Sequence, residues 1–344
     1  MTIKPNTSKP YQKEKQLALA TTMAAAKICQ RVRQEQQSQG LQKADSSPVT
    51  IADFAAQAVI CQLLKEAFPQ DSIIAEEDAA MLQTPELAAT LTGITSQVTQ
   101  IIPNATETDV INWINQGNGQ VAPRYWTLDP IDGTKGFIRG DQYAVALALV
   151  EEGEVKVGAI TCPALPFDFQ QPEGNKGVIF IAVKGQGSTA IAMDGQNQVT
   201  LKTNQYKDVQ KLKAIQSVET AHSDRNKQKV VAEKLGITQP PISMDSLAKY
   251  AAIARGEADI YLRIPLPQYV SLRENIWDHG AGVIVLEEAG GKVTDLDGKI
   301  LDFSFGPKLI KNRGIVASNG MIHREVLQVI KSMDMPELYE PDLL

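Results

Sequence analysis

The sequence predicts an α/β protein, in the layered α+β sense, whose helices and sheets alternate and form two domains. Three observations indicate this class. Amphipathic helices begin the chain, a series of strands occupies its middle, and strands alternate with helices after about residue 203. Since domains commonly hold about 100 to 200 residues, we expect a larger α+β domain over residues 1–205 and a smaller α/β domain over residues 206–344.

The first part of the predicted larger domain is mainly helical. Apolar residues recur at helical spacing in its first two segments, which indicates one buried face on each. Gly40 ends the first of these patterns, and the turn-forming sequence SSPVT, Ser46–Thr50, precedes the second. The expected elements are helices over residues 14–37 and 51–68, a strand over 72–75, weakly helical sequence over 84–102 and a short helix over 107–115.

Strands dominate the rest of this domain. Apolar or alternating runs follow one another with only Gly- or Pro-bearing turns between them. Strands in immediate succession form antiparallel sheets, because a parallel pair needs a long crossover connection. The expected strands cover residues 125–128, 143–151, 154–162, 177–184 and 188–193.

The predicted smaller domain has a different order, in which strands and helices alternate. This order is typical of a small α/β unit. The expected strands cover residues 213–218, 259–262 and 292–295, and the expected helices cover residues 224–235, 246–255 and 277–289. We expect His323 to lie at the surface near the start of the last helix, and His279 to face away from the chemistry or to cap its helix.

Composition and charge limit the classes of function. The net charge is −6 and the pI is about 5.3, which disfavours polymeric nucleic acid as a partner, because phosphate backbones are bound by basic surfaces. An acidic protein binds a small phosphate ester when a metal ion reverses the local field. The longest apolar runs, such as Tyr143–Val150, are too short to span a membrane. We expect no membrane partner, and a monomer in preference to a dimer.

Cysteine usage indicates the compartment. Cys29, Cys61 and Cys162 are odd in number, far apart and without the spacing of metal ligands. We expect reduced thiols and a cytoplasmic protein. The N-terminal residues also lack the apolar core of a secretory signal.

The stretch Trp126–Asp141, WTLDPIDGTKGFIRGD, carries the strongest chemical signal. Asp129 and Asp132 lie three positions apart at the end of an apolar segment. Pro130 and Gly133 favour a tight turn in which the two carboxylates converge. Two adjacent carboxylates repel one another unless a cation lies between them, and oxygen-only ligands suit Mg²⁺. The stretch therefore predicts metal-assisted phosphate chemistry.

Three further acids stand at the edges of expected elements. Asp53 lies at a helix start, Glu76 at a strand end and Asp278 at the start of another helix. Each taken alone is compatible with a structural role, as a charge favoured at a helix N-terminus or as part of a solvated loop. Together with the Asp129 and Asp132 pair they form a candidate metal centre.

Longer motifs carry a family resemblance. DPIDGT, the later WDxxAG beginning at Trp277 and the upstream acid pair resemble the lithium-sensitive, Mg²⁺-dependent phosphomonoesterases, which include inositol monophosphatases and fructose-1,6-bisphosphatases. Within that superfamily the chain is similar to the 3′(2′),5′-bisphosphate nucleotidases, which convert 3′-phosphoadenosine 5′-phosphate (PAP) to AMP. The resemblance covers residues 15–330 and rests on SPVTxxDxxAQ (47–57), WxLDPIDGTKGFxRGxQxAV (126–145), DSxAKY (245–250) and ADxYLRxP (258–265).

The resemblance implies an inositol monophosphatase-like fold and removal of the 3′-phosphate of PAP, and of its phosphosulfate analogue, by direct attack of a metal-activated water. It implies two or three Mg²⁺ ions, inhibition by Li⁺ and no covalent phosphoenzyme. It assigns Asp53 and Thr134 to orienting and deprotonating the water. The implied metal ligands are Glu76, Asp129, the carbonyl of Ile131, Asp132 and Asp278.

The resemblance also implies where the nucleotide binds. Lys249 and Arg263 supply fixed positive charge for the second phosphate of a bisphosphate. His222 is followed by SDR, where the family commonly has a stretch richer in His and Ser, so the sequence departs from the pattern there. The implied substrate-binding residues are Gly133, Thr134, His222, Ser246, Lys249, Arg263 and Asp278.

Other functions are compatible with parts of this pattern. Haloacid dehalogenase-type phosphatases have one residue between their two aspartates, near the N-terminus, whereas here two residues separate Asp129 and Asp132 at mid-chain. An inositol monophosphatase, an inositol polyphosphate 1-phosphatase or a fructose-1,6-bisphosphatase would keep the fold and change the substrate. A catalytically silent binding protein would lack a metal ligand or a water-activating residue, and all the acids named above are present.

Overall fold

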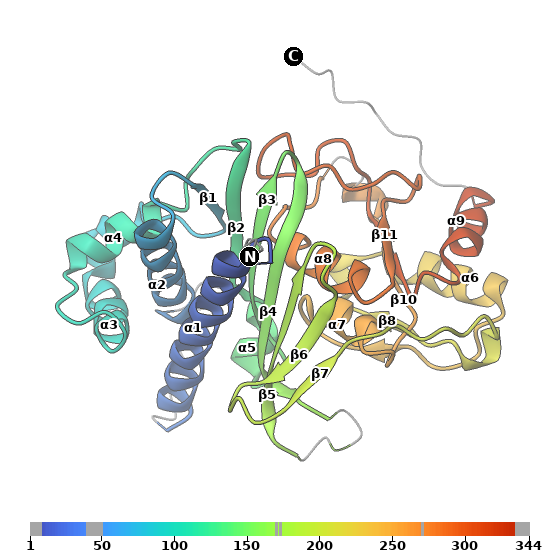
Figure 1. Cartoon of the computed structure of the whole chain (residues 1–344), viewed down its shortest axis with the longest axis horizontal. Coiled ribbons are helices and arrows are strands. Elements are labelled where there is room, and N and C mark those ends of the chain that lie inside the picture. Colours follow the sequence, from blue (N-terminus) through green and yellow to red (C-terminus); the bar gives the residue numbers. More distant parts are fainter. Residues whose placement is uncertain (1–8, 39–50, 169–170, 172–173, 270–271, 334–344) are drawn as a thin grey trace, which may run out of the picture.

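The computed structural model of the chain describes residues 9–38, 51–168, 171, 174–269 and 272–333. Helices and two sheets alternate in layers, as predicted (Figure 1). Helices α1 (Gln12–Ser38) and α2 (Ile51–Ala67) lie against one face of the first sheet. Gly40 and the SSPVT segment fall outside the described residues.

The first sheet has seven strands in the order β1-β2-β3-β4-β5-β6-β7. The pair β1 and β2 is parallel and every later pair is antiparallel, which confirms the predicted antiparallel succession. The strands are β1 (Ser72–Ala75), β2 (Arg124–Asp132), β3 (Ala144–Glu151), β4 (Glu154–Pro166), β5 (Lys176–Val183), β6 (Ser188–Ala192) and β7 (Gln198–Thr200).

The second sheet has five strands in the order β11-β12-β10-β8-β9. Two of them, β9 and β12, lie outside the predicted strands. Helices α6 (Arg225–Leu235) and α9 (His323–Lys331) contact each other at the far side of this sheet (Figure 1). The strands are β8 (Ala214–Gln216), β9 (Ile242–Ser243), β10 (Ile260–Arg263), β11 (Lys292–Thr294) and β12 (Ile315–Ser318).

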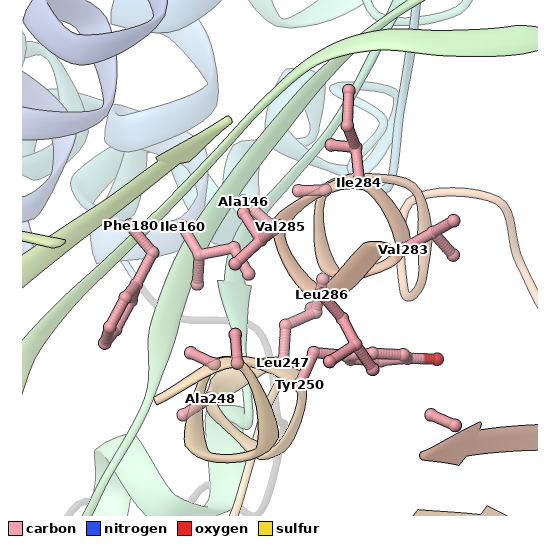
Figure 2. Close-up of a cluster of buried hydrophobic side chains, with 14 of the residues drawn as sticks. Ala146, Ile160, Phe180, Leu247, Ala248, Tyr250, Val283, Ile284, Val285 and Leu286 are labelled. Atoms are coloured by element: carbon pink, nitrogen blue, oxygen red, sulfur yellow. The ribbon is translucent and has the colours of Figure 1, made fainter. Parts of the chain in front are cut away.

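Two helices of the second half pack against the first sheet. Figure 2 shows residues of α7 (Ala248–Ala254) and α8 (Gly280–Glu287) facing Ala146, Ile160 and Phe180 of the strands. All residues of α8 from Gly280 to Leu286 are buried. A helix that is apolar all round is a core helix, so α7 and α8 form the layer between the two sheets.

Shorter helices complete the chain. Helix α4 begins where predicted, because Thr106 and Asp109 form a reciprocal capping box at its N-terminus. The weakly helical sequence over 84–102 becomes one 3-10 turn and one helix. None of the helices in the described ranges is long and apolar enough to cross a membrane. These elements are η1 (Met81–Gln83), η2 (Pro85–Leu87), α3 (Ala88–Thr99), α4 (Glu107–Asn115), α5 (Thr134–Arg139), η3 (Val209–Lys211), η4 (Thr220–His222) and η5 (Pro267–Tyr269).

The structure corrects two local expectations. Strand β2 does not end at Leu128 but continues to Asp132, with a shift of register against β3 between Asp129 and Asp132. A bulge of this kind accommodates a proline inside a strand. His323 is buried, not at the surface, because its ring nitrogens are hydrogen-bonded to the hydroxyls of Ser318 and Thr294, each at 2.9 Å.

Candidate active site

A cavity of about 230 Å³ collects most of the predicted site residues from both halves of the chain. Its walls come from the ends of β1 and β2, the start of α5, the turn before α7, strand β10 and the segment before α8. The predicted residues that line it are Glu76, Asp129, Ile131, Asp132, Gly133, Thr134, Ser246, Lys249, Arg263 and Asp278.

The bulge of β2 presents the central pair of carboxylates. Asp129 is 2% exposed, and its Oδ1 has no hydrogen-bond partner among the described residues. Asp132 accepts a hydrogen bond from the backbone N–H of Leu247. After Asp132 the chain reverses at Gly133, whose φ of 85° lies in the left-handed region that glycine adopts most readily. Thr134 then begins α5, and its hydroxyl donates to the carbonyl of Ile131 at 3.1 Å.

Burial and mutual repulsion raise the pKa values of these acids. The side chain of Glu76 is exposed to the cleft, but protein atoms surround most of its carboxylate. This partial burial, together with the charge of Asp278, raises the pKa of Glu76 to about 8. Burial and the neighbouring acids hold the pKa of Asp129 well above its usual range. The pKa of Asp132 is also raised, mainly by burial, and burial raises that of Asp278 to about 6.

This donor set fits a hard divalent cation. Four carboxylates converge on one cavity, and one of their buried oxygens lacks a partner among the described residues. A cation relieves both the repulsion and the unsatisfied oxygen. All the donors are oxygens, which favours Mg²⁺ or a similar ion over softer metals.

Two cations line the same cavity, and we call them its basic wall: Lys249 is buried, and Arg263 is half-buried. Lys249 is 5% exposed, its Nζ donates to the carbonyl of Ser246 at 2.7 Å, and burial lowers its pKa to about 8. Nε of Arg263 lies 2.7 Å from Oε2 of Glu274. Burial alone would raise the pKa of Glu274, but Arg263 and His279 lower it to about 2. The cavity therefore combines the four carboxylates, which we call its acidic wall, with two cations.

Two predicted residues are not among those lining the cavity. Asp53 is buried in the first turn of α2, and its charge contributes to the raised pKa of Glu76. His222 ends η4, but its side chain lies outside the described part of the structure. Its neighbour Ala221 lines an adjoining cavity of about 160 Å³, which shares Arg263 and Asp278 with the first.

Sequence reasoning missed several residues that contribute to the site. The ring of His279 lies between Tyr250, whose hydroxyl is 2.8 Å from Nδ1, and Glu274, whose Oε2 is 3.3 Å from Nε2. His279 occupies the N-cap position of α8 without capping it through its side chain, so the expected capping role is wrong. The signal that could have found Glu274 is its place four residues before Asp278 in the same segment.

Glu274 and His279 also bring ligand atoms within 4.8 Å of Asp278, a spacing that a metal ion could use. Both groups already have partners, since Glu274 pairs with Arg263 and His279 bonds to Tyr250. We therefore regard Glu274, Asp278 and His279 as a group that stabilises the cavity wall. Within this group, Asp278 is the residue that faces the other acids.

The Inositol monophosphatase family model matches residues 12–334. The chain belongs to the inositol monophosphatase family. This family is metal-dependent, in agreement with the acidic cavity.

The family members most informative about activity carry the name 3′(2′),5′-bisphosphate nucleotidase. One from Schizosaccharomyces pombe is 42% identical over 339 residues, covering 92% of this chain and 95% of that protein. One from Emericella nidulans is 39% identical, covering 94% of this chain and 99% of that protein.

Solved structures of the inositol monophosphatase family share the fold. An inositol monophosphatase from Anabaena (Nostoc) sp. PCC 7120 superposes with a TM-score of 0.60 at 22% identity, covering 95% of this chain and 99% of that one. The IMPase from Thermotoga maritima gives a TM-score of 0.62 at 21% identity, covering 93% and 98%. The predicted inositol monophosphatase-like fold is thereby confirmed.

Proposed function

We propose that this member of the inositol monophosphatase family is a Mg²⁺-dependent 3′(2′),5′-bisphosphate nucleotidase that hydrolyses the 3′-phosphate of PAP to give AMP and phosphate, and that it also acts on the phosphosulfate analogue. The observation that carries the proposal is that one cavity combines four carboxylates, its acidic wall, with two cations, its basic wall. A bisphosphate needs both walls, because one phosphate binds beside the metals while the other binds to cations. The names of the relatives support the same substrate.

Glu76, Asp129, Asp132, Asp278 and the carbonyl of Ile131 would hold two or three Mg²⁺ ions. Bound Mg²⁺ supplies positive charge that activates water at neutral pH and neutralises charge developing on the transferred phosphoryl group. Li⁺ inhibition follows from the family resemblance. Oδ1 of Asp129, for which the described part of the chain offers no hydrogen-bond partner, supports this ligand set.

Thr134 and Asp53 would prepare the attacking water. The Thr134 hydroxyl donates its hydrogen bond to the carbonyl of Ile131. The hydroxyl oxygen can therefore accept a hydrogen bond from water. Asp53 would take the proton that the water loses as its oxygen bonds to phosphorus. The bond between phosphorus and the 3′-oxygen then breaks, this oxygen takes up a proton from solvent water, and the nucleotide leaves as AMP beside the released phosphate.

The second phosphate and the nucleoside would bind at the basic wall. Lys249 and Arg263 contribute charge, Ser246 a hydroxyl and His222 a ring nitrogen, while Gly133, Thr134 and Asp278 approach the scissile phosphate. Burial of Lys249 supports this role, because a buried ammonium interacts more strongly with an anion than an exposed one.

The broader expectations also stand as proposals. The boundary at residues 205 and 206 falls between β7 and β8, which belong to different sheets. We propose a monomeric cytoplasmic enzyme, and the free, buried state of Cys29, Cys61 and Cys162 supports a reducing compartment.

The test is phosphate release with Mg²⁺ from PAP, inositol 1-phosphate and fructose 1,6-bisphosphate, compared by kcat/KM. We expect PAP to be preferred by about 100-fold or more, which corresponds to about 2.7 kcal/mol of differential transition-state binding. If kcat/KM for the sugar phosphates equals or exceeds that for PAP, the substrate assignment is wrong, but the proposed metal centre is not contradicted.

A further inference from the structure

A network of ion pairs at the edge of the cavity joins the two halves of the chain. Arg139, at the end of α5, contacts Oδ2 of Asp141 at 2.9 Å, Oε1 of Glu219 at 2.7 Å and Oδ2 of Asp245 at 2.7 Å. Lys135 of the same helix contacts Oε2 of Glu219 at 3.1 Å. Asp245 and Glu219 belong to the second half, so these contacts bind α5 to the segments that carry the basic wall.

Asp245 is the buried partner in this network. Its side chain is 6% exposed, whereas that of Arg139 is 38% exposed. A buried carboxylate needs a charged or hydrogen-bonding partner, and removing that partner is costly. Gly136 also makes room for Asp245, because a Cβ at this position would lie 2.7 Å from its Oδ2. Two residues of the KGFIRG motif, Gly136 and Arg139, thus meet the same carboxylate.

The turn that follows Asp245 carries the substrate-facing groups. Ser246 has a φ of 67°, which is unfavourable for a residue with a side chain. Its carbonyl accepts from Lys249, and the next N–H, that of Leu247, donates to Asp132. A strained turn persists only when the surrounding structure holds it in place. The ion pair between Arg139 and Asp245 anchors the chain at the residue just before Ser246.

We infer that Arg139 is a positioning residue for nucleotide binding, which acts through Asp245 to hold Ser246 and Lys249 in their binding geometry. The inference rests on the proposed function and deepens it. Arg139 itself does not need to touch the nucleotide. Its loss lets the turn at Ser246 relax, so the basic wall no longer meets the second phosphate in a prepared geometry.

The test compares Arg139→Ala and Arg139→Lys with a matched arginine. Arg124 also pairs with three carboxylates, those of Glu14, Asp71 and Glu151, and its side chain is 28% exposed. It lies at the opposite end of β2 from Asp132, about 25 Å away along an extended strand. Arg124→Lys therefore weakens a similar set of ion pairs without reaching the cavity, and it is the counterpart of Arg139→Lys.

Two readouts are measured for each full-length variant: AMP affinity by titration calorimetry with Mg²⁺, and kcat and KM for PAP. For Arg139→Ala we expect about 10-fold weaker AMP binding and a similar rise in KM with a smaller change in kcat, the pattern of lost uniform binding. Arg139→Lys should lie between this variant and the parent. Arg124→Lys should lower the melting temperature and leave AMP binding and KM at parental values.

A double variant, Arg139→Ala with Asp245→Asn, tests whether the two residues act as one unit. We expect it to bind AMP no more weakly than the single Arg139→Ala variant, because the second substitution removes a contact already lost. Additive losses would contradict action through Asp245. If the parent hydrolyses PAP and Arg139→Ala binds AMP as tightly as the parent, the positioning role is wrong and the proposed function stands. A parent that neither binds AMP nor hydrolyses PAP overturns both.

Discussion

The backbone N–H of Leu247 donates a hydrogen bond to Oδ2 of Asp132, across 115 positions of the chain. Asp132 belongs to the proposed metal ligands, and Leu247 directly follows Ser246 on the proposed nucleotide side. This hydrogen bond therefore links the acidic and basic walls of the cavity. Movement of the second half relative to β2 would change the metal centre and the substrate site together.

Asp132→Asn should abolish catalysis and preserve the fold. The amide oxygen can still accept from Leu247, but the loss of one charge weakens metal binding, so we expect kcat/KM for PAP to fall by about 1,000-fold or more. Melting in EDTA should change little or rise, because one repelling charge is gone. Kinetics and thermal unfolding of the same preparation check both parts, and hydrolysis at the parental rate would contradict the metal assignment.

Metal-free protein should lose stability as the pH rises from 6.5 to 8. The pKa of Glu76 is raised from 4.5 to about 8, so over this range the folded chain holds more protons than the unfolded chain. The free energy of unfolding therefore falls with increasing pH, by less than about 1.4 kcal/mol per pH unit, because water in the cleft screens Glu76.

Unfolding in EDTA at several pH values measures this slope. Glu76→Gln is the control, because it removes one titrating group and should make the fall shallower. Saturating Mg²⁺ should make it shallower as well and raise stability most at pH 8. A Glu76→Gln curve parallel to the parental curve between pH 6.5 and 8 would show that the pKa of Glu76 is not raised in the folded chain.

Activity on PAP should decline above about pH 8 because Lys249 loses its proton. Burial lowers the pKa of this ammonium from 10.5 to about 8, so the charge that meets the second phosphate is present below that pH and absent above it. The pH profile of kcat/KM reports groups of the free enzyme. Lys249→Arg keeps a charge at all these pH values and should move the decline upward, and an unchanged profile in this variant would assign the decline to another group.

Gly282→Ala should destabilise the layer between the sheets. A Cβ at this position would lie 2.4 Å from Cδ2 of Tyr250, which is fully enclosed by α7, α8 and the sheets. We expect the free energy of unfolding to fall by about 1 to 3 kcal/mol, measured by denaturant titration.

Gly93→Ala in α3 is the matched control, since its added Cβ would meet only the tip of the Ile51 side chain, at 3.1 Å. Alanine favours a helix over glycine by up to about 1 kcal/mol, so this variant should be neutral or slightly more stable. Equal losses in both variants would indicate that close packing of α7 on α8 is not the cause.

Local patterns in the sequence determined much of the fold and the core of the site. Helix α4 and strand β1 have the predicted bounds, because a capping box and a short apolar run are encoded by neighbouring residues. Five acids were selected as one group from the sequence, and the structure brings four of them to one cavity, whereas Asp53 is not among the lining residues. The four are Glu76, Asp129, Asp132 and Asp278. Their roles as ligands stay a prediction.

The tertiary structure decided what depends on residues far apart in the chain. The burial of His323 follows from partners on β11 and β12, and the continuation of β2 through Pro130 follows from pairing with β3. The contact of Arg139 with Asp245 spans 106 positions, and α7 and α8 pack on a sheet formed by the first half. Periodicity and spacing report which residues are buried or reactive, but the partners that bury or pair them are fixed only when distant segments meet.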